Sequence, residues 1–198
     1  MKKVVYVRAS KTDGVFSAGV LDSDSGECER LVLSVRRYPP LCDVRVGDAV
    51  NEELYSLMKL SDEEHRARKK ALSLLSFSDN NERTLKRKLA SHGISRGVAD
   101  SVSEEMVSLG YINEKRQLER LITSDAAKLY GPSKILARLC AKGYSASDIK
   151  QVMRELVDSG EIDFNAYASR LLEKKYPDGC SYDQRRALLY KHGYKSNK

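Results

Sequence analysis

Short apolar runs rich in β-branched residues occupy the first part of the chain. They lie at 4–7, 15–21 and 30–35, and turn residues separate them, first Asp13-Gly14 and then the polar stretch 22–26. This pattern predicts three strands. Prolines end the third run at 39 and 40, because proline has no N–H to donate to a strand ladder. A three-stranded sheet alone is marginal, so we expect it to pack on the helix that follows.

That helix has a clear start signal at Asn51, which is followed by two glutamates and a leucine. From about residue 61 the apolar spacing becomes that of amphipathic helices with short glycine-containing joints. Ser61-Asp62-Glu63-Glu64 resembles a capping box, and Pro132 suits a first helical turn. We therefore expect a small β-rich N-terminal region at 1–60 that ends in a short helix, and a separate helical part beyond it.

The helical part repeats itself with a period of 50 residues. The segment 89–94 aligns without gaps with 139–144 and 189–194, and its leucine and glycine recur in all three copies. Downstream, 106–113 aligns with 156–163. Chance similarity between helices is the competing explanation, and three gapless alignments with matched caps disfavour it. Three more apolar positions coincide upstream, at Leu72, Ile122 and Leu172.

Caps at the repeated positions divide each unit into three helices. Gly93, Gly143 and Gly193 follow a basic last turn, where a left-handed residue ends a helix with little strain. Ser145 with Asp148 predicts a capping box. One unit then has helices at roughly 64–77, 81–92 and 95–109. The predicted helical repeats are 61–113 and 114–163, each ended by a cap residue (Asn113, Asp163), and a third, truncated after two helices, at 164–198.

These patterns predict a mainly α fold built from tandem three-helix repeats. A unit of this size buries little apolar surface by itself, so stacked units are expected to form an elongated, curved array. Such an array offers a long binding surface rather than a pocket.

Charge separates the two parts of the chain. The 198 residues carry a net charge of +7. Residues 1–60 contain nine basic and nine acidic residues, so the whole excess lies in 61–198. A basic helical part favours an acidic partner, with nucleic acid the first candidate. No apolar run is long enough for a membrane span or a signal peptide, so we expect a cytoplasmic protein with reduced, partly buried cysteines.

The sequence holds no recognisable catalytic or ligand-binding motif. Phosphate-binding loops, nucleophile elbows and the H-E-x-x-H zinc signature are all missing. Asp22 and Asp24 lie among Ser and Gly, as turn residues do. We therefore expect a protein that is not an enzyme, with no catalytic residues, no metal site and no cofactor.

The second helix of each unit is basic on the side away from its inward-facing leucine and isoleucine positions. A solvated helix face explains each helix singly. Recurrence in three units favours a shared strip that binds phosphates or an acidic protein groove. Tyr111, Tyr144 and Tyr194 lie just outside helix ends, and we favour packing over the joints above base stacking for them. The strip comprises Arg83, Lys86, Arg87, Lys134, Arg138, Lys142, Arg185, Arg186 and Lys191.

Several segments of the first two repeats stand in a specific order and spacing. In the first repeat they are Ala71–Leu75, Glu82–Leu89 and Gly110–Arg116. In the second they are Gly131–Ile135 and Leu139–Gly143, which fit the pattern G-P-x-x-I-x-x-x-L-x-x-K-G. Through this order and spacing, rather than through one motif, residues 66–194 resemble the RecX regulatory protein family. The N-terminal strands resemble an extension that some members carry.

The resemblance implies a non-enzymatic regulator of the RecA recombinase in DNA repair, recombination and the SOS response. It implies binding to the RecA filament on single-stranded DNA and modulation of recombinase and ATPase activity; inhibition is the effect we favour, and tuning stays open. The stacked repeats predict a monomer, and the lack of a long apolar run predicts no membrane contact. Groove binding and end capping of the filament stay open, as does weak direct DNA binding. The alternative is a basic protein that binds nucleic acid by itself, such as a helix-turn-helix-like transcription factor. One departure concerns packing, because Arg185 stands where the other units have Leu85 and Ile135.

Overall fold

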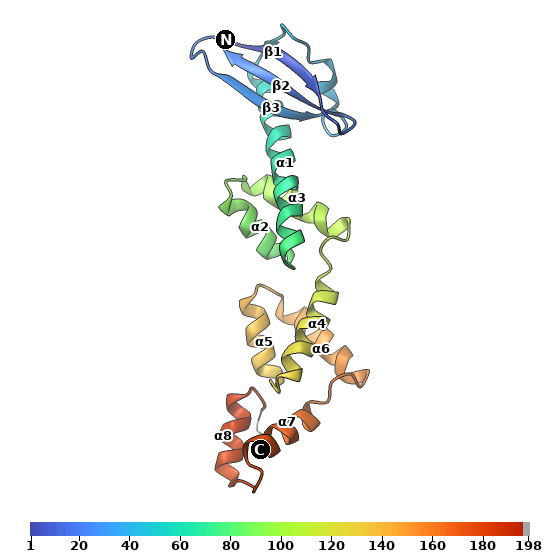
Figure 1. The fold of residues 1–198 in the computed structure, drawn as a ribbon, viewed down its shortest axis with the longest axis vertical. Coiled ribbons are helices and arrows are strands. Elements are labelled where there is room, and N and C mark those ends of the chain that lie inside the picture. Colours follow the sequence, from blue (N-terminus) through green and yellow to red (C-terminus); the bar gives the residue numbers. More distant parts are fainter. Residues whose placement is uncertain (196–198) are drawn as a thin grey trace. The chain divides into compact units, whose positions relative to one another are not determined.

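The computed structural model describes residues 1–195, which form two compact units. Unit 1 comprises Met1–Ser78 and Leu85–Met106, and unit 2 comprises Asp79–Thr84 and Val107–Lys198. Figure 1 shows a mainly helical chain with a small antiparallel sheet near the N-terminus, which confirms the expected fold class.

The sheet of unit 1 contains the three expected strands and a fourth that the sequence did not reveal. Its order is β3-β2-β1-β4, and all neighbouring strands are antiparallel. The fourth strand has only two residues, too few to show an alternating pattern. The strands are β1 (Lys2–Ala9), β2 (Val15–Asp22), β3 (Cys28–Ser34) and β4 (Ala49–Val50).

The first helix is longer than the sequence predicted. Helix α1 (Glu52–Phe77) begins at the expected cap, where Asn51 Oδ1 accepts from Leu54 N, but it continues through the predicted helix start at Ser61. The predicted capping box at Ser61 is therefore wrong. Instead Ser61 Oγ accepts from Ser34 N at 2.9 Å, and Asp62 Oδ1 accepts from Val32 N at 3.0 Å. These two side chains satisfy the open edge of β3, so the same residue types that start a helix elsewhere cover a sheet edge here.

Apolar and ionic contacts both hold unit 1 together. The inner face of the sheet packs on Met58 of α1, as expected for a sheet too small to stand alone. The buried carboxylate of Glu64 accepts from Arg37 Nε at 2.7 Å and from Arg68 Nη2 at 2.9 Å, and both guanidiniums also pair with Glu105. The second and third helices of this region are α2 (Glu82–Ser91) and α3 (Arg96–Ser108).

Five further helices, α4 to α8, follow in unit 2 and keep the 50-residue period. Helices α2, α5 and α8 begin at 82, 132 and 182, and α3 and α6 begin at 96 and 146. The closed core of α4, α5 and α6 is built on Leu118, Ile122, Ile135 and Leu139, each at most 1% exposed. The helices are α4 (Glu114–Ala127), α5 (Pro132–Ala141), α6 (Ala146–Asp158), α7 (Phe164–Lys175) and α8 (Tyr182–Lys191).

The repeated glycines end their helices in the predicted left-handed conformation. Their φ angles are +78° at Gly93, +97° at Gly143 and +86° at Gly193. In each case the residue after the glycine donates its N–H to the helix leucine five positions earlier, which gives one backbone motif three times. Asn113 and Asp163 cap α4 and α7 through their side-chain oxygens, also as predicted.

Two predicted details of the repeat are wrong. Ser145 precedes α6 in an extended conformation, but its hydroxyl lies 2.6 Å from Ser147 Oγ and makes no capping bond, because a neighbouring serine satisfies it first. Leu72 is 42% exposed while Ala71 is fully buried, so the upstream alignment with Ile122 does not mark equivalent core positions.

The cysteines also differ from the expectation of partly buried thiols. All four are free and exposed. Cys140, for example, follows the buried core position Leu139 on the solvated side of α5.

Candidate functional site

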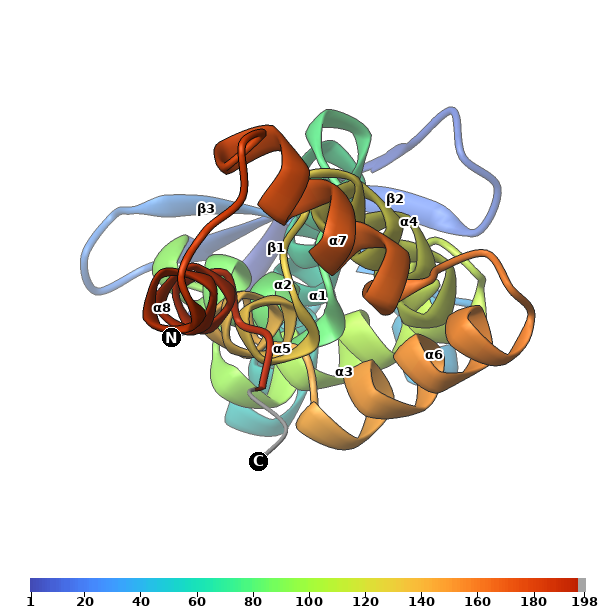
Figure 2. The ribbon, with the colours of Figure 1, turned by 90° about the horizontal axis from the view of Figure 1, so that it is seen from below.

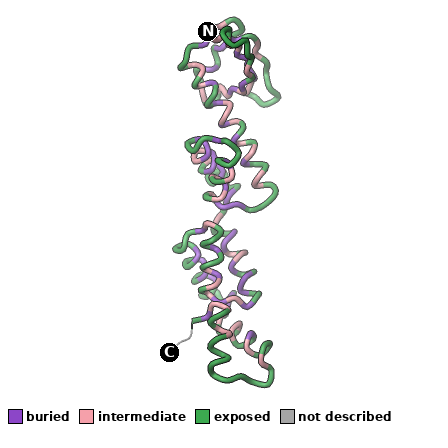
Figure 3. The backbone as a smooth tube through the Cα atoms, turned by 90° about the vertical axis from the view of Figure 1, so that its left-hand side faces the viewer, coloured by how far each residue is buried: buried purple, intermediate pink, exposed green. Residues whose placement is uncertain are grey.

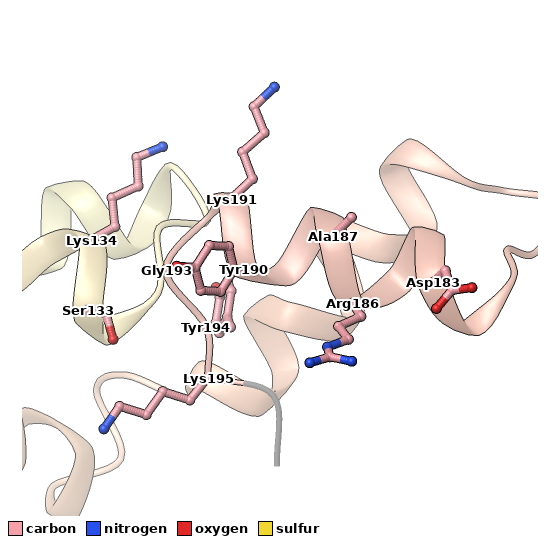
Figure 4. A pocket seen from close by; sticks show the side chains of 10 residues that line it. All are labelled: Ser133, Lys134, Asp183, Arg186, Ala187, Tyr190, Lys191, Gly193, Tyr194 and Lys195. Atoms are coloured by element: carbon pink, nitrogen blue, oxygen red, sulfur yellow. The ribbon is translucent and has the colours of Figure 1, made fainter. Parts of the chain in front are cut away.

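Figure 2 shows α8 beside α5, both in unit 2. A basic cleft of about 890 Å³, which we call the α5–α8 cleft, lies between the start of α5 and the length of α8. The lining residues, shown in Figure 4, are Ser133, Lys134, Asp183, Arg186, Ala187, Tyr190, Lys191, Gly193, Tyr194 and Lys195.

Backbone contacts between the two repeats fix the geometry of the cleft. Gly131 N donates to His192 O at 2.7 Å, and Ser133 N donates to Gly193 O at 3.0 Å. The two backbones approach so closely that a Cβ on Gly131 would lie 2.6 Å from Gly193. The free N–H groups at the α5 N-terminus therefore bind the carbonyls of the two residues that directly follow α8, and this contact places Lys134 beside the end of α8.

A related joint exists one repeat earlier, within the same unit. Lys142 O, equivalent to His192 O, accepts from Asn81 Nδ2 at 3.1 Å and from Thr84 Oγ1 at 3.3 Å. Side chains replace the backbone donors in this copy. The period thus repeats a contact as well as a helix pattern: the start of one second helix binds the glycine joint of the next.

Positive charge dominates the cleft. Its lining contains four cationic side chains and one carboxylate, that of Asp183. Asp183 lies in the first turn of α8, where the helix dipole favours an acid. Tyr190 is 80% exposed among these cations. Figure 4 shows the long side chains of Lys134 and Lys191 extending away from the ribbon on the same side. Lys134 Nζ lies 4.1 Å from the ring centre of Tyr130, a cation–π contact that orders its stem.

The positive charge of the cleft also affects His192, which lies behind it. Burial lowers the pKa of His192, and repulsion from Lys134 and Lys191 lowers it further. Its Nδ1 is buried and makes no hydrogen bond. The imidazole is therefore neutral at neutral pH. His192 is half-buried, whereas the equivalent His92 of the first repeat is exposed.

Three of the nine predicted strip residues come together in this cleft, namely Lys134, Arg186 and Lys191. Two others in the same unit turn elsewhere. Arg138 Nε binds the buried carboxylate of Asp125 at 3.0 Å, and Arg185 lies on the side of α8 that faces α7.

The remaining predicted residues do not line the cleft. Arg83 and Lys142 lie at the earlier joint, where a Cβ on Gly143 would lie 3.6 Å from the Arg83 side chain. Lys86 is half-buried and pairs with Asp100 and Glu104 of α3, while Arg87 is exposed. A single strip that includes all nine residues stays a prediction.

Two residues of the cleft escaped the sequence reasoning, Tyr190 and Lys195. Tyr190 follows the repeated leucine and falls four residues after Arg186, on the solvated face of α8, which was the available signal. Of the three tyrosines predicted to pack, Tyr144 and Tyr194 are 7% exposed and do so, whereas Tyr111 is 56% exposed.

The arrangement can bind an anionic group and an aromatic or apolar group side by side. Lysine and arginine suit phosphates or carboxylates, and an exposed tyrosine suits stacking. Within residues 1–195 no three His, Cys, Asp or Glu side chains gather as a metal site would require. None of the described helices is long and apolar enough to span a membrane.

Known proteins with similar sequences are regulatory proteins. A protein of Pseudomonas putida named Regulatory protein RecX is 28% identical over 128 residues, which cover 64% of this chain and 82% of the relative. The Regulatory protein RecX of Halorhodospira halophila is 30% identical over 118 residues, covering 60% and 71%. No model of a protein family matches the chain.

Solved structures support the fold. The structure described as regulatory protein RecX superposes with a TM-score of 0.70 at 17% identity and covers 99% of this chain and 96% of the other. The RecX structure from Lactobacillus salivarius superposes with a TM-score of 0.57 at 20% identity, covering 68% and 90%. The first of these matches includes the N-terminal sheet, since it spans nearly the whole chain.

Proposed function

Because the chain belongs to the RecX family of regulatory proteins, we propose that it binds the RecA–DNA nucleoprotein filament and lowers the recombinase and ATPase activity of RecA. It acts as a binding protein, without chemistry of its own. The observation that carries the proposal is this family membership, together with a basic cleft whose charge suits an acidic filament.

The α5–α8 cleft is the part of unit 2 that we assign to the filament. Three of its cations, Arg186, Lys191 and Lys195, are exposed, and Lys134 is half-buried with its Nζ over the Tyr130 ring, so an acidic partner can approach all four from solvent. Arg138 differs, because Asp125 already occupies its guanidinium. Acidic side chains of the recombinase and phosphates of its DNA both complement the cleft, and acidic side chains are the partner we favour.

The test is the ATPase activity of RecA on single-stranded DNA, measured with increasing amounts of this protein. We expect ATP hydrolysis to fall with added protein at moderate salt. Addition of a matched amount of an unrelated basic protein controls for simple competition for DNA. Unchanged hydrolysis at saturating protein would contradict the proposal.

A second candidate is direct binding of nucleic acid without RecA. The exposed Tyr190 among cations favours it, because bases stack on exposed aromatic rings beside phosphate-binding lysines. Affinity for bare single-stranded DNA would then fall with salt, with a log–log slope near −0.7 per phosphate contacted. Inhibition of RecA with weak, salt-insensitive DNA binding favours the filament; tight DNA binding without inhibition favours the second candidate.

A further inference from the structure

In the second repeat, one helix covers the other two. Helix α6 packs on both α4 and α5, and its buried side chains Ile149, Val152, Met153 and Leu156 join one cluster with four residues of the helices beneath. Those four are Leu118 and Ile122 of α4 and Ile135 and Leu139 of α5. The repeat therefore shows directly what kind of element fits over this pair of helices.

In the third repeat, the equivalent positions line an open groove between α7 and α8. Adding the period of 50 to the four core positions gives Ala168, Leu172, Arg185 and Leu189, and all four line a cavity of about 370 Å³. No residue of α8 is buried, whereas the equivalent leucines and isoleucine of α2 and α5 are fully buried. Figure 3 shows the contrast, with exposed colouring along α8. No third helix follows α8 within residues 1–195.

Two residue differences from the second repeat make this groove suitable for a partner with a polar group. Arg185 takes the place of the fully buried Ile135, and Ala168 takes the place of Leu118, which leaves room on the groove floor. An arginine under a purely apolar helix would lose its hydration without a partner, which is strongly unfavourable. A helix that carries a carboxylate at this point would satisfy it.

We propose that the groove between α7 and α8 binds an amphipathic helix of a partner protein, seated as α6 is seated in the second repeat, with an acidic residue against Arg185. Its apolar face covers Leu172 and Leu189, and Arg186 and Lys195 at the rim add to the charge preference. Helix α6, which plays this role in the second repeat, has 13 residues, which sets the expected length. This inference does not depend on the proposed action on RecA.

The probe is a synthetic peptide with the sequence of residues 145–159, capped at both ends, which contains the α6 helix. Four further peptides each replace one of its buried residues by glutamate: Ile149→Glu, Val152→Glu, Met153→Glu and Leu156→Glu. Binding to the full chain is measured by fluorescence anisotropy. We expect one glutamate peptide to bind about tenfold more tightly than the unmodified peptide, because its carboxylate pairs with Arg185.

The variant Arg185→Ile supplies the decisive reversal. It restores the residue type of the second repeat, so the unmodified peptide should now bind more tightly than the glutamate peptides. Arg185 is exposed, so the fold should persist, and circular dichroism checks this. The variant Arg170→Gln, on an exposed position of α7 outside the groove, is the matched control and should leave the peptide preference unchanged.

Three outcomes overturn the proposal. The first is that no peptide binds the unmodified protein. The second is that Arg185→Ile leaves the order of peptide affinities unchanged. The third is concentration-dependent dimerisation that Arg185→Glu abolishes, since a second copy would then occupy the groove. Loss of RecA inhibition is no part of this test, so its outcome stands apart from that of the proposed function.

Discussion

The second and third repeats share their joints and differ in their cores. Gly143 and Gly193 end α5 and α8 with the same left-handed turn and the same backbone bond. Yet Ile135 is fully buried beneath α6, while its counterpart Arg185 is exposed. The glycine joint is thus a local device that needs no third helix, whereas the buried core requires one.

The contacts that join neighbouring repeats are therefore independent of the surfaces that each repeat exposes. The joint depends on a backbone conformation and on hydrogen bonds to the neighbouring α5, both of which survive in the third repeat. Burial of apolar area depends on a covering helix. No described helix covers α8. It therefore exposes charged and aromatic side chains on one side and borders the groove with α7 on the other.

Placing at Ile135 the residue of its counterpart Arg185 should have the largest effect on stability, and the reverse change at 185 should have little. Ile135→Arg places a charge without a partner beneath α6, and we expect the free energy of unfolding to fall by roughly 3–5 kcal/mol. Arg185→Ile changes an exposed residue and should alter it by less than about 0.5 kcal/mol. Denaturant titrations of both variants measure the contrast. Equal effects would mean that the two repeats have equally closed cores.

The two outer glycine joints should differ by a smaller amount. Gly93 has open space around it, so Gly93→Val carries mainly the strain of its positive φ angle, about 1–2 kcal/mol. At Gly193 a Cβ would also lie 2.4 Å from the Lys134 backbone N, so Gly193→Val should loosen α8 as well. Thermal melts report the first effect, and faster hydrogen exchange along α8 reports the second. Protected α8 amides in Gly193→Val would show that the joint tolerates a side chain.

The smallest predicted effect concerns the pairing of Asp125 with Lys128 and Arg138 in the second repeat. Burial raises the pKa of Asp125, but hydrogen bonds from Lys128 and Arg138 outweigh it, so the pKa lies below its ordinary value of 3.8. The contribution of the Asp125 carboxylate to stability is complete above pH 3.8, and it is lost as the pH falls through the lower folded pKa. Asp125→Asn should therefore lower the free energy of unfolding by only about 0.5–1 kcal/mol at pH 7, because the cationic partners are partly exposed to solvent. The difference from the unmodified protein should shrink as the pH falls below 3.8 and through the lowered folded pKa, and a pH-independent difference would refute this assignment.

Local signals in the sequence predicted most of the fold. The period of 50, the left-handed glycines and the caps at Asn51, Asn113 and Asp163 were all readable, because each depends on a few adjacent residues. The failures came from contacts across the chain. Ser61 was assigned to a helix start, but its hydroxyl covers the β3 edge 27 residues earlier, which no local pattern shows. The elongated stacking of all repeats stays a prediction.

The candidate site was only partly predictable for the same reason. Lys134, Arg186 and Lys191 could be selected because they recur on the outer faces of second helices. The sequence could not show that Arg138 turns to Asp125, since that pairing joins two helices. It also could not show that Arg185 leaves the strip for the groove, because its exposure depends on whether another helix covers α7 and α8, and none does within residues 1–195.

The most direct test neutralises the α5–α8 cleft and measures inhibition of RecA ATPase on single-stranded DNA. The variant Lys134→Gln/Arg186→Gln/Lys191→Gln removes three charges and keeps most of each side chain. The control Lys150→Gln/Arg154→Gln/Lys174→Gln removes three charges from exposed positions of α6 and α7 in the same unit. We predict that the cleft variant loses inhibition while its circular dichroism stays unchanged, and that the control inhibits normally. Full inhibition by the cleft variant would show that these cations are only a solvated face, and would contradict the account.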